Sequence, residues 1–230
     1  MNVRRTPRMC LSVAACAAVL AGCGSLHPGE AATVGDTVIT EDQLADSTEG
    51  FCELLKAAQA AQGGGNASLP LRIASLNAAN QLILGAAIDD LAAKRDLTLS
   101  DSEVDEWMRQ LPFDLDGVPE DKAEAVDEIT RRLARNTLLT AELGRIAFER
   151  DNPGQQPEDP QALQERGSRV AQRHLAQLDP ETNPRYGNVL NPQQANPGTG
   201  SLSQPVSDEA KEDMSVPGPT SELPEDQMCP

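Results

Sequence analysis

The chain is poor in aromatic side chains and in histidine. Aromatics make up 2% of its 230 residues, and there are only two histidines, His27 and His174. A hydrophobic core must therefore be built from Leu, Ala, Ile and Val, which favours closely packed helices over a β-sandwich. Two isolated histidines complete no set of metal ligands at any known zinc-site spacing. We expect no metal site and no cofactor other than a covalent lipid.

Positive charge is also scarce. Lys and Arg together number 19 against 36 Asp and Glu, which gives a formal net charge of −17. Such a surface repels phosphate backbones, so we expect no nucleic-acid partner. The sequence also lacks a glycine-rich phosphate loop, a nucleophile elbow and a CxxC pair, which are short signatures of common catalytic sites. The chain is therefore not expected to be an enzyme.

The first 22 residues have the three parts of an export signal. Three arginines lie within the first eight residues, a short apolar run follows over Met9–Leu20, and small residues precede Cys23. The run is shorter than the roughly 20 residues that cross a bilayer, and the order is typical of a cleaved leader. The Arg4-Arg5 pair leaves the export route open between the general secretory and the twin-arginine pathway.

The segment Leu20-Ala21-Gly22-Cys23 resembles the lipobox of bacterial lipoproteins. The resemblance implies that the Cys23 thiol receives a diacylglycerol and that acylation, palmitate included, anchors the chain to the extracytoplasmic face of the cell membrane. Each buried CH₂ of an acyl chain contributes about 0.8 kcal/mol to membrane attachment, and two or three chains suffice. The alternative is an ordinary secretory signal with a chance cysteine. We expect a signal peptide over 1–22 and a tether over 23–31.

A β-hairpin is predicted directly after the tether. In TVGDTVIT (33–40), two β-prone segments flank Gly35-Asp36, and glycine at the first loop position permits a type II′ turn. Thr40 and Gln43 then have the spacing of a capping box, so a helix should start there. Three consecutive glycines end it after Gln62.

Four further helices are indicated by apolar periodicity, capping residues and Pro or Gly stops. We expect them over 70–95, 100–111, 119–151 and 159–177. The first is apolar over most of its circumference and should lie at the centre of a bundle. The predicted fold class is mainly α: a bundle of about five helices, with a small N-terminal β-hairpin joined by a short C-terminal strand.

Beyond Asp179 the sequence becomes polar. Nine of the 17 prolines lie between Pro180 and Pro230, and such a segment buries too little apolar surface to offset its ordering entropy. We expect the helical domain to cover 32–190 and a proline-rich, acidic, disordered tail to cover 191–230. The exception is RYGNVL (185–190), which has strand-like composition and is the candidate partner of the hairpin.

Two of the five cysteines lie outside the predicted leader and are not the predicted lipid site, Cys23. Cys52 lies in the first helix and Cys229 is the penultimate residue. An even pair in an exported protein suggests a disulfide, which would strap the tail across the bundle and contribute up to roughly 4–5 kcal/mol in the chain-entropy model. The alternative is a buried thiol at Cys52 and a free or intermolecular thiol at Cys229.

Taken in order, TVGDTVITEDQL, DLTLSDSEVDEWM, a long helix and NPRYG resemble the N-terminal chaperone domain of SurA-type peptidyl-prolyl isomerases. The likeness is greatest to actinobacterial lipoprotein versions and covers residues 31–190. In that family a parvulin isomerase domain enters before the last helix of the bundle. Here only NPGQQPE (152–158) stands at that place, so the resemblance implies a chaperone module without the isomerase.

The resemblance implies binding of unfolded or exported polypeptides in grooves lined by aliphatic side chains. The alternative function is that of an envelope lipoprotein that holds one folded partner and has no chaperone activity. The acidic tail either keeps the module soluble or folds back over a groove in place of a client. The sequence leaves both pairs of alternatives open.

Overall fold

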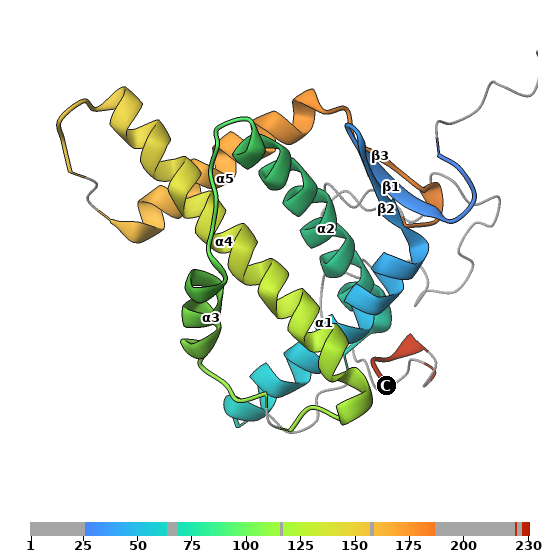
Figure 1. Cartoon of the computed structure of the whole chain (residues 1–230). Coiled ribbons are helices and arrows are strands. Elements are labelled where there is room, and N and C mark those ends of the chain that lie inside the picture. Colours follow the sequence, from blue (N-terminus) through green and yellow to red (C-terminus); the bar gives the residue numbers. More distant parts are fainter. Residues whose placement is uncertain (1–25, 64–68, 116, 157–158, 187–223, 225–226) are drawn as a thin grey trace, which may run out of the picture.

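Five α-helices and a small sheet make up the computed structural model, which describes residues 26–63, 69–115, 117–156, 159–186, 224 and 227–230 (Figure 1). The predicted fold class is confirmed. In chain order the elements are β1 (Glu30–Val34), β2 (Thr37–Thr40), α1 (Glu41–Ala61), α2 (Leu71–Ala93), α3 (Asp101–Arg109), the 3₁₀ turn η1 (Glu120–Lys122), α4 (Ala123–Asp151), α5 (Pro160–Gln177), β3 (Glu181–Thr182) and the 3₁₀ turn η2 (Pro184–Tyr186). Among the helices of these described ranges, none combines the length and the apolar character needed to cross a bilayer.

The sheet has the order β2-β1-β3, with antiparallel pairing on both sides of β1. The predicted two-residue loop is present: Val34 pairs with Thr37, and Gly35 has a φ of +56°. The Gly35 N–H also donates to the carbonyl of Leu178 at 3.3 Å, just beyond α5. The hairpin turn and the end of the last helix are therefore in direct contact.

The strand that closes the sheet lies earlier in the chain than predicted. It is Glu181–Thr182, whereas Arg185 and Tyr186 belong to η2, so the predicted strand is wrong at these two positions; 187–190 lie outside the described residues. The physical reason is Pro184, which has no N–H to donate to a ladder. Asn183 makes the last main-chain bond to β1, from its N–H to the Ala31 carbonyl at 2.8 Å.

Three helix starts follow the predicted capping chemistry. The side chains of Thr40 and Gln43 satisfy each other's backbone N–H groups at the start of α1, and Ser100 and Glu103 do the same for α3. The Asp159 carboxylate accepts from the Gln161 N–H at the start of α5. These contacts use N–H groups that have no partner inside the helix.

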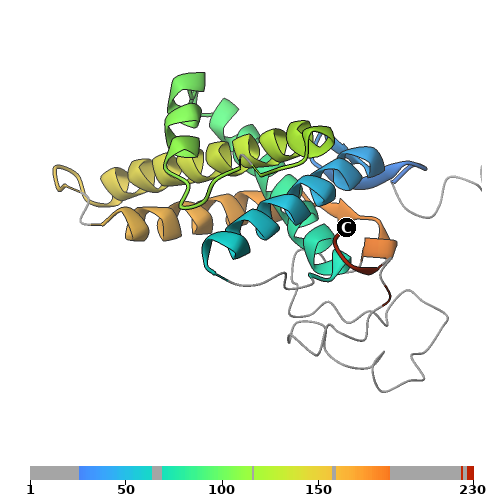
Figure 2. The same cartoon turned by 90° about the horizontal axis from the view of Figure 1, so that it is seen from below.

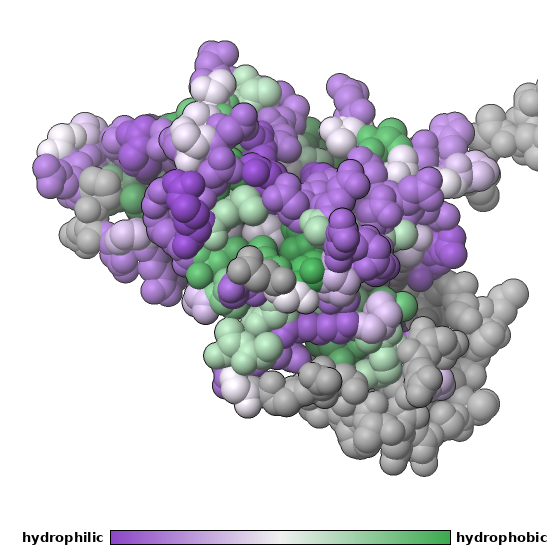
Figure 3. Space-filling model, turned by 60° about the horizontal axis from the view of Figure 1, so that its bottom comes forward, coloured by the Kyte–Doolittle hydropathy of each residue, from purple (hydrophilic) through white to green (hydrophobic). Residues whose placement is uncertain are grey.

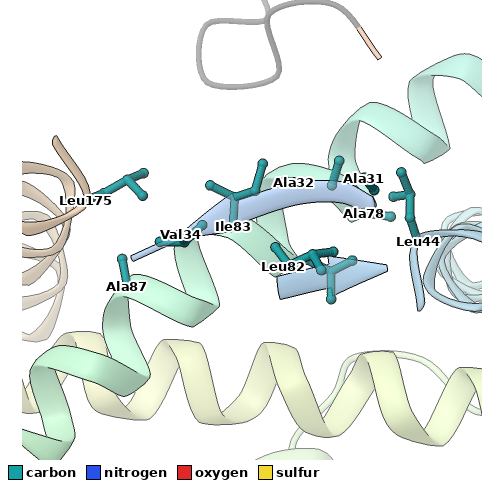
Figure 4. Close-up of a cluster of buried hydrophobic side chains, with 11 residues drawn as sticks. Ala31, Ala32, Val34, Leu44, Ala78, Leu82, Ile83, Ala87 and Leu175 are labelled. Atoms are coloured by element: carbon teal, nitrogen blue, oxygen red, sulfur yellow. The ribbon is translucent and has the colours of Figure 1, made fainter. Parts of the chain in front are cut away.

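Two hydrophobic clusters share α2, which lies in the middle of the bundle as predicted (Figure 1). One cluster packs the sheet, α1 and the end of α5 against the first part of α2, and the other packs α4 and α5 against its second part. The side chains labelled in Figure 4 belong to the first cluster: Ala31, Ala32, Val34, Leu44, Ala78, Leu82, Ile83, Ala87 and Leu175. All five aromatic residues are described, and none is fully buried.

Helices α4 and α5 pack unusually closely, as an antiparallel pair that extends away from the sheet (Figure 1). A Cβ on Gly144 would lie 1.9 Å from the carbonyl oxygen of Leu163, and a Cβ on Gly167 would lie 1.8 Å from that of Thr140. Both distances are far shorter than a van der Waals contact. The backbones of the two helices therefore touch at these two glycines, where no side chain separates them. The chain between them consists of 152–159.

We predict that Gly167→Ala destabilises the protein by about 1–3 kcal/mol, because the added methyl forces the two helices apart. For a chain of this size the melting temperature should fall by roughly 2–12 °C, which thermal unfolding followed by circular dichroism measures. Gly117→Ala is the matched control, because a Cβ there meets nothing within 4 Å. Equal melting temperatures for the two variants would contradict the close packing.

Candidate functional site

A groove of about 830 Å³ lies between the first halves of α1 and α2. We call it the α1–α2 groove. Its lining comes from four segments: Glu41, Leu44, Ala45, Asp46, Thr48 and Glu49 of α1; Pro70, Leu71, Arg72 and Ser75 at the start of α2; Tyr186 of η2; and Gln227 and Pro230 at the C-terminus. Figure 2 shows the C-terminus beside α1, and Figure 3 shows hydrophobic patches within a hydrophilic surface on the face turned forward.

The floor of the groove is a surface of the core. Leu44 is 3% exposed and belongs to the cluster beneath the sheet, while Ala45 on the same turn is exposed. The Thr48 hydroxyl donates to the Leu44 carbonyl at 2.6 Å, so its proton is not offered to a ligand. Helical spacing places these residues on one face of α1, and the core holds that face in place.

Two acidic side chains on the rim of the groove form ion pairs with basic residues of distant segments. The Arg185 guanidinium donates to the Glu41 carboxylate at 2.7 Å, and the Lys122 ammonium donates to the Glu49 carboxylate. Each carboxylate raises the pKa of its basic partner through that hydrogen bond. Glu41 and Glu49 are therefore already compensated, so the groove offers a ligand its apolar floor and the two other charged lining residues, Asp46 and Arg72.

Tyr186 forms the end wall of the groove. The ring packs against the first hydrophobic cluster, and the Arg185 guanidinium lies 5.4 Å from its centroid. Burial raises the pKa of the Tyr186 phenol, Arg185 opposes that effect and Glu41 adds to it. The phenol is thus a neutral, half-buried group, suited to apolar contact and hydrogen bonding.

The opposite wall is the end of the chain. The structure brings the two cysteines singled out in the sequence together: Cys52 and Cys229 form a disulfide with their Cα atoms 5.5 Å apart. The Cys229 N–H donates to the Leu69 carbonyl at 2.8 Å, and Met228 pairs with Pro70 in an antiparallel bridge. We call Gln227–Pro230 the C-terminal strap. Met228 and Cys229 hold the tail against the segment that precedes α2, so the tail is not free there, contrary to the expectation for 191–230.

Neither histidine lines the groove. Cys23 lies outside the described residues. The Nδ1 atom of His27 lies 3.5 Å from the Glu30 carboxylate. His174 is 11% exposed, and its Nε2 lies 2.5 Å from the Asp90 carboxylate. Within the part of the chain that is described, no three His, Cys, Asp or Glu side chains gather in a way that could hold a metal ion.

The sequence predicted aliphatic grooves in general and offered the Cys52–Cys229 disulfide as one of two alternatives, of which the structure has the disulfide, but it did not predict this groove. The groove combines residues of 41–75 with residues of 186–230, which lie more than 100 positions later, and no local pattern reports that kind of proximity. One available signal was Tyr186, the only tyrosine in the sequence.

Comparison with known proteins assigns no relative. No protein-family model, no curated protein and no solved structure matches the chain. The site must therefore be interpreted from its own geometry.

The Asp90 carboxylate joins α2 to α5 and should make stability depend on pH. Hydrogen bonds from Lys94 first and His174 second lower its pKa. A carboxyl group whose pKa is lower in the folded than in the unfolded state stabilises the fold at pH values above its unfolded pKa, which is near 3.8. This contribution is lost as the pH falls below that value. We predict that Asp90→Asn destabilises the protein at pH 7 and that this difference shrinks markedly at pH 3.

Urea unfolding at both pH values measures the difference. Asp89→Asn is the control, because it removes a neighbouring carboxylate that lies 3.6 Å from Arg135 instead. A destabilisation by Asp90→Asn of the same size at pH 7 and pH 3 would show that the ionised carboxylate is not what stabilises the α2–α5 contact.

Proposed function

We propose that this protein is a lipid-anchored, extracytoplasmic chaperone-like module that holds unfolded segments of exported polypeptides in the α1–α2 groove. The observation that carries the proposal is that a polypeptide segment of this chain already forms one wall of the groove. The C-terminal strap lies along the start of α2, with a main-chain hydrogen bond and an antiparallel bridge. A site that accepts this segment has the form needed for other extended chains.

The chemistry of the groove supports a client of mixed sequence. Its floor is apolar and offers hydrophobic contact, which is non-directional and tolerates many side chains. Leu44, Ala45, Leu71 and Tyr186 contribute to this surface. The acids Glu41 and Glu49 are paired with bases of the same chain, so they do not demand a specific countercharge. Selection by apolar content rather than by sequence follows from this arrangement.

The proposed anchor fits the position of the groove. Cys23 would carry the lipid, and β1 begins at Glu30, so a tether of a few residues at most ~3.6 Å each would hold the module close to the membrane. Leu44 of α1 belongs both to the hydrophobic cluster beneath the sheet and to the groove lining. The groove would therefore face polypeptides that emerge near the membrane surface.

An isomerase step is not part of the proposal. The chain from the end of α4 to the start of α5 spans only 152–159. In the SurA-type family that the sequence resembles, the parvulin domain is inserted at this place. The module would act by binding alone. Release would then depend on the equilibrium between bound and folded client rather than on catalysis.

The test is binding of several unrelated, chemically denatured polypeptides, measured by fluorescence anisotropy and by suppression of their aggregation. We predict that Ala45→Glu weakens binding about tenfold, or about 1.4 kcal/mol, because it places a charge on the apolar floor. Ala45 is exposed, so the fold should tolerate the change.

Ala162→Glu is the matched control, since it adds the same charge at an exposed position of α5, away from the groove. Equal binding by both variants would contradict the assignment of the groove. Recovery of one native partner by crosslinking, with no binding of denatured chains, would instead support the alternative of an envelope lipoprotein that holds a single folded protein.

A further inference from the structure

The disulfide that holds the C-terminal strap joins a fully buried cysteine to a partly exposed one. Cys52 is 0% exposed and sits in α1, one turn beyond Thr48 and Glu49 of the groove. Cys229 is only partly buried, and its neighbour Pro230 is exposed. An attacking thiolate must reach a sulfur along the S–S axis. Of the two, Cys229 is the sulfur that an external thiol can approach.

Little else fastens the strap to the described part of the chain. Its main-chain contacts are the Cys229 N–H bond to Leu69 and the bridge between Met228 and Pro70, both in the segment just before α2. The Gln227 N–H donates locally, to the Pro224 carbonyl. A solvent-accessible backbone hydrogen bond contributes only about 1 kcal/mol net. The covalent bond is therefore what keeps the strap in place.

We propose that Cys229 is a thiol–disulfide exchange site and that reduction of its bond to Cys52 releases the strap from the α1–α2 groove. This inference rests on the proposed function, because it names how occupancy of the same groove is controlled. The reductant is of the dithiol class, as carried by thiol–disulfide oxidoreductases. The disulfide-linked form keeps Gln227 and Pro230 as one wall of the groove, and the dithiol form loses that wall.

The exchange proceeds in two balanced steps. A thiolate of the dithiol attacks Sγ of Cys229, the bond to Cys52 breaks, and Sγ of Cys52 leaves as a thiolate that takes up a proton. The second thiolate of the dithiol then attacks its own sulfur in the mixed disulfide and expels the Cys229 thiolate, which is also protonated. Two electrons and two protons pass to the protein, and the dithiol leaves as a disulfide.

Release of the strap frees two features that a client needs. The Leu69 carbonyl loses its bond from the Cys229 N–H and becomes available to an extended peptide. The wall formed by Gln227 and Pro230 also leaves, which lengthens the groove along α2. The strap and a client thus compete for the same backbone edge, as in recognition by strand addition.

The experiment uses the full chain purified from its native cell, with free thiols first blocked by iodoacetamide. Its affinity for a fluorescent, carboxymethylated and permanently unfolded polypeptide is measured with and without a phosphine reductant. We expect reduction to strengthen binding by roughly tenfold, because apparent affinity scales with the fraction of molecules whose groove is free. Cys229→Ser should bind like the reduced protein and should not respond to the reductant.

Two further measurements separate this inference from the proposed function. Hydrogen exchange of the peptide containing Gln227–Pro230 should become fast on reduction and should be fast in Cys229→Ser. A dithiol reductant whose second cysteine is replaced by serine should be trapped on Cys229 and not on Cys52. Absence of client binding in every form, with the strap released, would defeat the proposed function but not the exchange site.

Three outcomes would overturn the inference. The first is a strap that stays protected from exchange after reduction, and the second is a mixed disulfide found on Cys52. The third is equal client affinity of the oxidised and reduced forms in protein that does bind clients. Each is distinguishable from the loss of client binding that would sink the proposed function.

Discussion

The pairing of β1 on both of its edges is the constraint on which the rest of the structure depends. One neighbour, β2, is adjacent in the chain, but the other, β3, follows α5 and lies about 150 residues away. A two-stranded hairpin is marginal in water by itself. With β3 in place, the sheet has a covered apolar face that packs on α2, and the two ends of the helical domain are fixed to each other.

The groove exists because of that closure. Asn183, directly after β3, bonds to Ala31, and the chain then turns through η2, which brings Arg185 and Tyr186 over the first turn of α1. Without β3 the end wall of the groove and the partner of Glu41 would both be absent. The sheet therefore positions the binding surface although it contributes little to it directly.

Features encoded within a few neighbouring residues were predictable, and features that depend on distant segments were not. The capping residues Thr40, Ser100 and Asp159 mark helix starts because their chemistry is local. The closing strand was misplaced because apolar composition favoured the segment around Tyr186. The segment that pairs with β1 is instead set by the position of the chain just after the end of α5. The groove combines α1, α2, η2 and the C-terminus, and no spacing rule links these four segments.

Native-state hydrogen exchange at Asn183 tests the closure most directly. Its N–H donates to the Ala31 carbonyl at 2.8 Å across the β1–β3 pair. If closure stabilises the whole domain, this amide exchanges only through global unfolding, with the same opening free energy as the buried amides at the centre of α2. Exchange at the rate of an unstructured peptide, while α2 remains protected, would contradict the account.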